Sequence, residues 1–192
     1  AALGTAQERK FVIKGEMVSN KLCYSNDSVK EVRLELLVDG VQTLISASPV
    51  KEGKFTFEGT APEELTLCNI TGFDNGAIQL FLEEGEIIVG PFDAAYPVAA
   101  KIGGTPCNDI NQAYIDLNNR CINESKARMK AAYETIPDEI KGKPEAEMKY
   151  TSPTFYVNNM HFKVAIMDFI YQHIDSPVVL YIIKYAMLPM FT

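Results

Sequence analysis

The stretch VKEGKFTFEGT, residues 50–60, carries the clearest signal for the fold of the N-terminal half. The Glu52-Gly53 pair is typical of a tight turn, because glycine tolerates the left-handed backbone conformation that such turns require. Phe55 and Phe57 follow two residues apart, and successive side chains of a strand point to opposite faces. The stretch therefore predicts the end of one strand, a two-residue turn and a second strand with one apolar face.

Similar turn signals recur along residues 9–103 at intervals of about 10 to 13 residues, which leaves room only for short strands. Apolar residues alternate between these turns, and such strands must bury their apolar faces against a second sheet or in a barrel. We predict an antiparallel β-sandwich of about seven or eight strands over residues 9–104. The inward positions include Val32, Leu34, Leu36, Val38, Phe55, Phe57, Ile78, Leu80 and Leu82.

The spacing of apolar residues changes after Gly104. They now recur every three or four residues, which predicts one long helix over residues 105–136. Thr105 followed by Pro106 suits a helix start, with Asp109 in the first turn, and Pro137 ends the run. The predicted apolar stripe consists of Ile110, Tyr114, Leu117, Cys121, Ser125, Met129, Ala132 and Ile136.

Two further helices are predicted after a polar loop at residues 136–147. The pair Ser152-Pro153 is expected to begin the second helix, and Asp175-Ser176-Pro177 the third. Residues 105–192 therefore form a helical region of about three helices. The apolar positions of the second helix include Tyr156, Met160, Ile166, Met167 and Ile170, and the predicted inward residues of the third are Val179, Leu180 and Ile183.

Composition and charge narrow the classes of partner. The 192-residue chain is 47% hydrophobic and carries a net charge of −7. An acidic chain repels a phosphate backbone, so we expect no nucleic-acid partner. The most apolar stretch, residues 178–192, is interrupted by Lys184 and Pro189 and is shorter than the roughly 20 residues that a spanning helix needs. We expect a packing helix there and no membrane span.

The two ends of the sequence suggest an exported fragment of a longer protein. Residues 1–8 contain the small-x-small spacing Gly4-x-Ala6, so we interpret them as a residual export segment or a flexible N-terminus. The apolar residues Met190 and Phe191 come just before the last residue, Thr192, and no polar tail follows them in this sequence. We expect the parent protein to continue beyond this point.

The four cysteines, at positions 23, 68, 107 and 121, include no C-x-x-C pair. Zinc ribbons and thioredoxin-type redox sites both require that close spacing. Cys107 lies at a predicted helix N-terminus, where the helix dipole stabilises a thiolate, so it is a candidate reactive thiol; the alternative is a packed, inert thiol. A disulfide between Cys23 and Cys68 is an open alternative in an oxidising compartment.

Other chemistry-bearing residues give no pattern of a known catalytic centre. His161 and His173 are twelve positions apart and do not form a metal-binding pair on one helix. Glu83 and Glu84 border a turn, where adjacent acidic residues are usually solvated. No phosphate-binding loop, nucleophile elbow or zinc-protease motif occurs. We therefore assign no catalytic, cofactor-binding or metal-binding residue.

Aromatic residues are the remaining candidates for ligand contact. The chain is 10% aromatic, with nine tyrosines and no tryptophan, and these residues are spread through both halves. Core packing explains this distribution as well as ligand binding does. If a concave pocket forms between the sandwich and the helices, we expect Tyr114, Phe155 or Tyr156 to border it.

Five stretches together resemble a known family. They are FVIKGEM (11–17), VKEGKFTFEGT (50–60), LFLEEGEIIV (80–89), KIGGTPCN (101–108) and YQHIDSPVVLYIIKYAM (171–187). In this order they resemble the domain of unknown function 4369 of Bacteroidetes. That domain precedes a thioredoxin-like, peroxiredoxin-type domain in exported thiol-disulfide oxidoreductases.

The resemblance implies a protein of the periplasm or cell envelope, with a lipid anchor in the precursor as one variant. It implies that this region is an N-terminal accessory module and that a thioredoxin-like domain with the C-x-x-C pair follows. Its partners would be that domain and an envelope protein substrate. Because the C-x-x-C pair is absent from residues 1–192, the resemblance supplies no catalytic residue and no cofactor.

Three functional hypotheses follow from the sequence. The leading one is a non-catalytic module that positions the thioredoxin-like domain or mediates assembly. The second is a free-standing envelope protein that binds a ligand or peptide. The third is a cysteine-dependent enzyme that uses Cys107, with His161 or His173 as its base.

Overall fold

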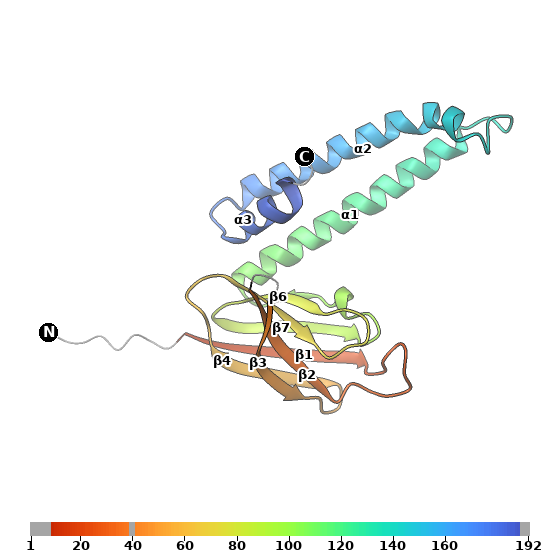
Figure 1. Ribbon diagram of the computed structural model, residues 1–192. Helices are drawn as coiled ribbons and strands as arrows, with labels where there is room; N and C mark the ends of the chain where they lie inside the picture. The colour runs from red at the N-terminus through yellow and green to blue at the C-terminus, as the bar shows by residue number, and fades with distance from the viewer. Residues whose placement is uncertain (1–8, 39–40, 189–192) are drawn as a thin grey trace. The chain divides into compact units, whose positions relative to one another are not determined.

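The computed structural model describes residues 9–38 and 41–188, without the side chains of Leu37 and Val38. The chain divides into two compact units, Ala1–Gln112 and Ala113–Thr192 (Figure 1). The first unit thus includes the start of the first helix, whereas the sequence placed the boundary at Gly104. The predicted export segment at residues 1–8, the Asp39-Gly40 turn and the apolar end at Met190 and Phe191 lie outside the described residues.

The first unit contains eight strands in two four-stranded sheets, which confirms the predicted two-sheet fold. One sheet has the order β4-β1-β7-β8 and the other the order β3-β2-β5-β6. A short 3₁₀ helix, η1 (Pro97–Ala99), precedes β8. The strands are β1 (Lys10–Ser19), β2 (Glu31–Val38), β3 (Val41–Pro49), β4 (Lys54–Thr60), β5 (Thr66–Thr71), β6 (Ile78–Leu82), β7 (Gly85–Asp93) and β8 (Ile102–Gly103).

One strand pair differs from the predicted antiparallel pattern. β1 and β7 run parallel, with Phe11 opposite Gly85 and Ile13 opposite Ile87. The other described pairs within the two sheets are antiparallel. Parallel neighbours need a long connection, and strands β2 to β6 supply one between β1 and β7. A repeat of two along the sequence predicts strands but does not predict their direction.

The core of this unit lies between the two sheets and follows the predicted alternation. Val32, Leu34 and Leu80 are completely buried, and the two phenylalanines of β4 are almost so. Each such side chain contributes roughly 1.5–3 kcal/mol when it leaves water. Val38 was also predicted to point inward, but its side chain is not among the described parts. The buried cluster also includes Phe11, Ile13, Ile70, Ile78, Ile87, Val89 and Phe92.

The predicted Glu52-Gly53 turn is confirmed, but the strands on either side of it separate. Glu52 and Gly53 have φ angles of 52° and 76°, and Lys51 and Lys54 exchange backbone hydrogen bonds of 2.9 and 2.8 Å. Beyond these bonds, β3 joins one sheet and β4 the other. The stretch that predicts a hairpin therefore forms the corner at which the chain passes between sheets.

Three helices follow the strands, as predicted. α1 (Pro106–Glu134) begins at the expected proline, and its predicted apolar stripe is half-buried or buried at every position. α3 (Val178–Ile182) begins after Ser176, whose Oγ accepts a 3.3 Å hydrogen bond from the backbone N–H of Val178. A π-helical turn, η2 (Ile183–Met187), follows it.

The predicted start of the second helix is wrong. α2 (Pro144–Gln172) begins nine residues before Pro153, which lies inside the helix. Pro144 already provides the fixed φ angle that favours a first helical position. The Glu147 carboxylate also accepts a 2.7 Å hydrogen bond from the N–H of Gly142, just before the helix. Pro153 lacks an N–H group and removes one internal hydrogen bond, which the long helix tolerates.

Several apolar positions of the predicted helices are exposed. Ile166, Ile170 and Val179 are buried as expected. The predicted inward position of Leu180 is wrong, and three apolar positions of α2 are also exposed, because α2 is apolar on two faces and the spacing alone does not indicate which face packs against the rest of the unit. These exposed residues are Tyr156, Met160, Met167 and Leu180.

Candidate functional site

The first turn of α1 is attached to the edge strand β6 by the side chain of Asn108. Its amide accepts a 3.0 Å hydrogen bond from the N–H of Phe81 and donates a 2.7 Å bond to the carbonyl oxygen of the same residue. This is the pairing that a neighbouring strand would provide. Asn108 is completely buried, and its Nδ2 also donates to Thr105 Oγ1 at 2.9 Å. The amide thus satisfies the two backbone groups that Phe81 presents at this sheet edge.

Glu83 caps the helix that Asn108 attaches. Its Oε1 accepts hydrogen bonds from the backbone N–H groups of Cys107 (2.8 Å) and Asn108 (3.2 Å). A carboxylate at this position satisfies unpaired amides and interacts favourably with the positive end of the helix dipole. Sequence analysis treated Glu83 as a solvated turn residue and named Thr105 as the cap. The Thr105 hydroxyl instead accepts from the Asn108 side chain.

Cys107, the candidate reactive thiol, is buried beside this carboxylate. Burial is the largest cause that raises the pKa of the Cys107 thiol, and together with the hydrogen bond and negative charge of Glu83 it raises this pKa to about 12. The helix dipole was expected to favour the thiolate, but the Glu83 carboxylate occupies that end of the helix. The surroundings of Cys107 therefore favour the neutral thiol.

The other cysteines lie in unrelated places. Cys68 is completely buried in β5, and burial raises its pKa to about 11. Cys23 is exposed, Cys121 is half-buried on α1, and all four thiols are free in this structure. The described thiols therefore form no redox pair.

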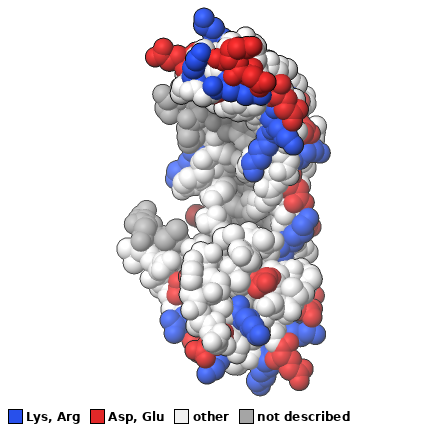
Figure 2. Space-filling model, turned by 90° about the vertical axis from the view of Figure 1, so that its right-hand side faces the viewer, with Lys and Arg blue, Asp and Glu red and all other residues white. Residues whose placement is uncertain are grey.

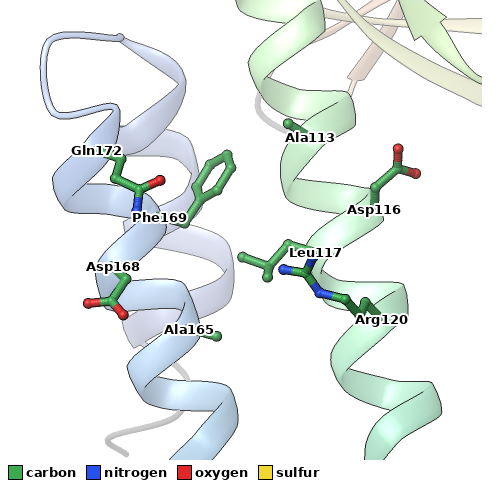
Figure 3. A pocket seen from close by; sticks show the side chains of 8 residues that line it. All are labelled: Ala113, Asp116, Leu117, Arg120, Ala165, Asp168, Phe169 and Gln172. Carbon is green, nitrogen blue, oxygen red and sulfur yellow. The ribbon is translucent and has the colours of Figure 1, made fainter.

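A cavity of the helical unit lies between α1 and α2 (Figure 3). It has a volume of about 570 Å³. Figure 3 shows Leu117 and Phe169 pointing into the space between the helices, with Arg120 reaching in beside Leu117 and Asp168 pointing away from α1. The lining residues are Ala113, Asp116, Leu117, Arg120, Ala165, Asp168, Phe169 and Gln172.

A second cavity of about 410 Å³ shares Leu117, Arg120 and Ala165 with the first, so the two are neighbours, and we call them together the groove between α1 and α2. A buried polar cluster borders its far end. Asn158 accepts a 2.6 Å hydrogen bond from Arg128 Nε and donates a 3.3 Å bond to the carbonyl oxygen of Ser125. The groove therefore offers apolar side chains, an amide and guanidinium groups, which suits an extended ligand with both polar and apolar parts.

The structure does not bring the three predicted ligand-contact residues into one site. Tyr114 is half-buried, and its ring contacts that of Phe169 at a tilt of 56°, with ring centroids 5.9 Å apart. Phe155 and Tyr156 contact each other at 6.0 Å and are largely exposed. Phe155 and Phe169 are fourteen residues apart on α2, or about 21 Å along the helix. A pocket between the sandwich and the helices remains a prediction.

The two histidines also have separate surroundings. His161 borders the second cavity, and His173 follows the end of α2, where its ring lies 4.5 Å from that of Phe169. In residues 9–38 and 41–188, no three His, Cys, Asp or Glu side chains are placed to hold a metal ion. No helix in the described part of the chain is long and apolar enough to cross a membrane.

Charged side chains of both signs gather around the loop between α1 and α2 (Figure 2). This loop and its flanks include Asp138, Glu139, Lys141, Lys143 and Glu145. Lys141 Nζ lies 2.5 Å from Asp138 Oδ1, and this contact holds the pKa of the Asp138 carboxyl below its usual value. A mixed surface of this kind provides no positive patch for a polyanion.

Sequence reasoning missed the residues that form the polar networks. Asn108 is the third residue of α1, and Glu83 directly follows β6. The two residues are far apart in the sequence, so only the folded structure reveals the contact between them. The capping-box pattern, a hydroxyl residue followed three positions later by a polar one, was the available signal for Asn108. Arg128 and Asn158 lie thirty residues apart, and no local pattern indicates their pairing.

Substitution of Glu83 tests the capping role. We expect Glu83→Ala to lower the free energy of unfolding by about 1–2 kcal/mol, because two buried first-turn amides lose their acceptor. Glu84→Ala is the matched control, since the described contact of Glu84 is an exposed ion pair with Arg9 at 3.4 Å. Urea unfolding followed by circular dichroism measures both. Equal effects of the two substitutions would contradict the capping role.

Alkylation with iodoacetamide at pH 8 tests the state of Cys107. Because the raised pKa leaves very little thiolate, we expect Cys107 to react at least about a hundredfold more slowly than Cys23 in the folded protein. Both should react readily after unfolding in urea. Peptide mass spectrometry gives the rate at each position. Rapid reaction of Cys107 near pH 6 would instead support a catalytic thiolate.

Comparison with known proteins identifies the first unit. Residues 11–111 match the family described as Domain of unknown function (DUF4369). No curated protein and no solved structure matches the chain. The match ends in the first turns of α1, at the part of the helix that Asn108 and Glu83 attach to the sheet. The match covers more than half of the chain, which therefore belongs to the DUF4369 family.

Proposed function

We propose that this chain is a non-catalytic binding module of an exported thiol-disulfide oxidoreductase, which positions a thioredoxin-like domain or mediates assembly in the periplasm or cell envelope. The family match supports this proposal for the strand-rich unit. The thioredoxin-like context comes from the resemblance of the five sequence stretches. In this account the redox chemistry belongs to the partner domain.

The thiols of this chain support a role without chemistry. Burial raises the pKa of Cys68 and Cys107 well above that of a free thiol, so little nucleophilic thiolate forms near neutral pH. Cys23 is exposed and Cys68 completely buried, so they do not offer an accessible pair for dithiol exchange. These environments give no support to the alternative of a cysteine enzyme that uses Cys107.

The observation that carries the proposal is the large amount of apolar side chain that the helical unit exposes. Tyr171 of α2 is 81% exposed and Leu180 of α3 is 71% exposed. Scattered apolar residues on a surface are ordinary, but a concentration of large ones on one small unit indicates a binding surface. Such a surface binds another protein without a catalytic group. Other exposed members are Tyr156, Met160, Val164, Met167, Ile174 and Tyr185.

The groove between α1 and α2 favours the second candidate, a free-standing envelope protein that binds a peptide or another extended ligand. Its two cavities of about 570 and 410 Å³ share three lining residues, and Arg120, Asp168 and Gln172 border them as well as apolar residues. A ligand with alternating polar and apolar groups would match these walls. This candidate requires no thioredoxin-like partner.

Reduction of insulin disulfides by dithiothreitol tests the non-catalytic role. We expect the chain to leave the rate equal to that of dithiothreitol alone, because it offers no adjacent thiol pair. A thioredoxin serves as the positive control and Cys107→Ser as the matched variant. Acceleration comparable to that by thioredoxin would contradict the proposal, and its loss in Cys107→Ser would assign the activity to that thiol.

A further inference from the structure

α2 is apolar on two opposite faces. The inner face packs within the helical unit, and its residues are half-buried or buried: Asn158, Phe162, Ala165, Ile166 and Phe169. The apolar residues on the opposite face are each between 48% and 81% exposed. We call this second set the outer seam, and it consists of Val157, Met160, Val164, Met167 and Tyr171.

The spacing of the outer seam matches a coiled-coil repeat. Its residues follow one another at intervals of three, four, three and four, which is the a/d pattern of a heptad. Such a stripe stays on one side of a helix and fits another helix with the same repeat. A globular surface or a small ligand does not require this regularity. The expected occupant is therefore a second helix.

The charges beside the outer seam indicate that this second helix is α2 of another copy of the chain. With Val157 and Val164 as a-type positions, Lys163 lies on one edge at a g position and Asp168 on the other edge at an e position. In a parallel pair, each g residue faces the e residue five positions later in the partner. Lys163 of each copy would thus face Asp168 of the other copy, which gives two such charge pairs in the dimer. An antiparallel pair would bring edges of like charge together.

We infer that two copies of this chain associate through the outer seam of α2, with the two α2 helices parallel and in register. The contact is symmetric, so each copy contributes the same residues. The inference rests on the assembly part of the proposed function, because it uses exposed side chains of the same surface, and it does not require an oxidoreductase partner.

Two other occupants fit the surface less well. Helices that lie on membranes usually carry Lys and Arg on their polar side, whereas this seam has one acid and one base beside it and the chain has a net charge of −7. A thioredoxin-like domain offers no reason for the heptad spacing. Both remain outcomes that the experiment separates from self-association.

Sedimentation velocity of the 192-residue chain over a range of concentrations tests the inference. We expect a monomer–dimer equilibrium that Met160→Glu weakens at least about tenfold, because it places a charge in the seam. Met148→Glu is the matched control. Met148 lies on the same helix outside the seam and is 58% exposed, against 61% for Met160. We expect the control to leave the dimer unchanged, and circular dichroism checks the fold of each variant.

A cross-link tests the direction of the helices. In a parallel pair in register, the a-type positions at residue 171 face each other within the roughly 6 Å that a disulfide spans between Cα atoms. We expect Tyr171→Cys, in a Cys23→Ser background, to form a covalent dimer through position 171 on mild oxidation. In an antiparallel pair the two positions are far apart and no such link forms.

Several results would overturn the inference. One is a monomer at every soluble concentration, and another is a dimer that Met160→Glu and Met148→Glu weaken equally. A seam-dependent dimer without a cross-link at position 171 would reject the parallel arrangement. Binding of monomers to phospholipid vesicles, lost in Met160→Glu, would assign the seam to lipid. None of these results bears on the insulin assay, so the proposed function would be judged separately.

Discussion

The paired hydrogen bonds between the Asn108 amide and the backbone of Phe81 are the constraint on which the rest of the structure depends. They satisfy the backbone groups of Phe81 at the edge of β6 and fix the first turn of α1 against that strand. Glu83 strengthens the same junction, because its carboxylate accepts two first-turn amides. Beyond Gln112 the helix belongs to the other compact unit. Glu83 thus caps the helix, and burial together with its carboxylate favours the neutral thiol of Cys107.

The two units are stabilised in different ways. The first buries a continuous apolar core between its sheets, and its exposed strand faces are largely polar. The helical unit leaves a groove between α1 and α2 and exposes the outer seam of α2. A sheet pair that buries its apolar faces needs no partner, whereas a helix with two apolar faces leaves one uncovered by its own unit. Binding is therefore expected of the helical unit.

The sequence predicted the fold class because alternation in strands and a three-to-four spacing in helices are local patterns. It failed where a non-local choice decides the outcome. The direction of β1 relative to β7, the continuation of α2 through Pro153 and the outward position of Met160 all depend on neighbours distant in the chain. The same holds for the site, since the contacts of Glu83 with Cys107 and of Arg128 with Asn158 join residues 24 and 30 positions apart.

Native-state hydrogen exchange tests most directly whether the start of α1 folds with the strands. The account predicts that amides of residues 107–112 exchange only when β5 and β6 open, with the same free energy of opening. Amides in the later turns of α1, and in α2, should exchange through a separate opening of lower free energy. Exchange of residues 107–112 together with the rest of α1, while β6 stays protected, would contradict the central role of Asn108.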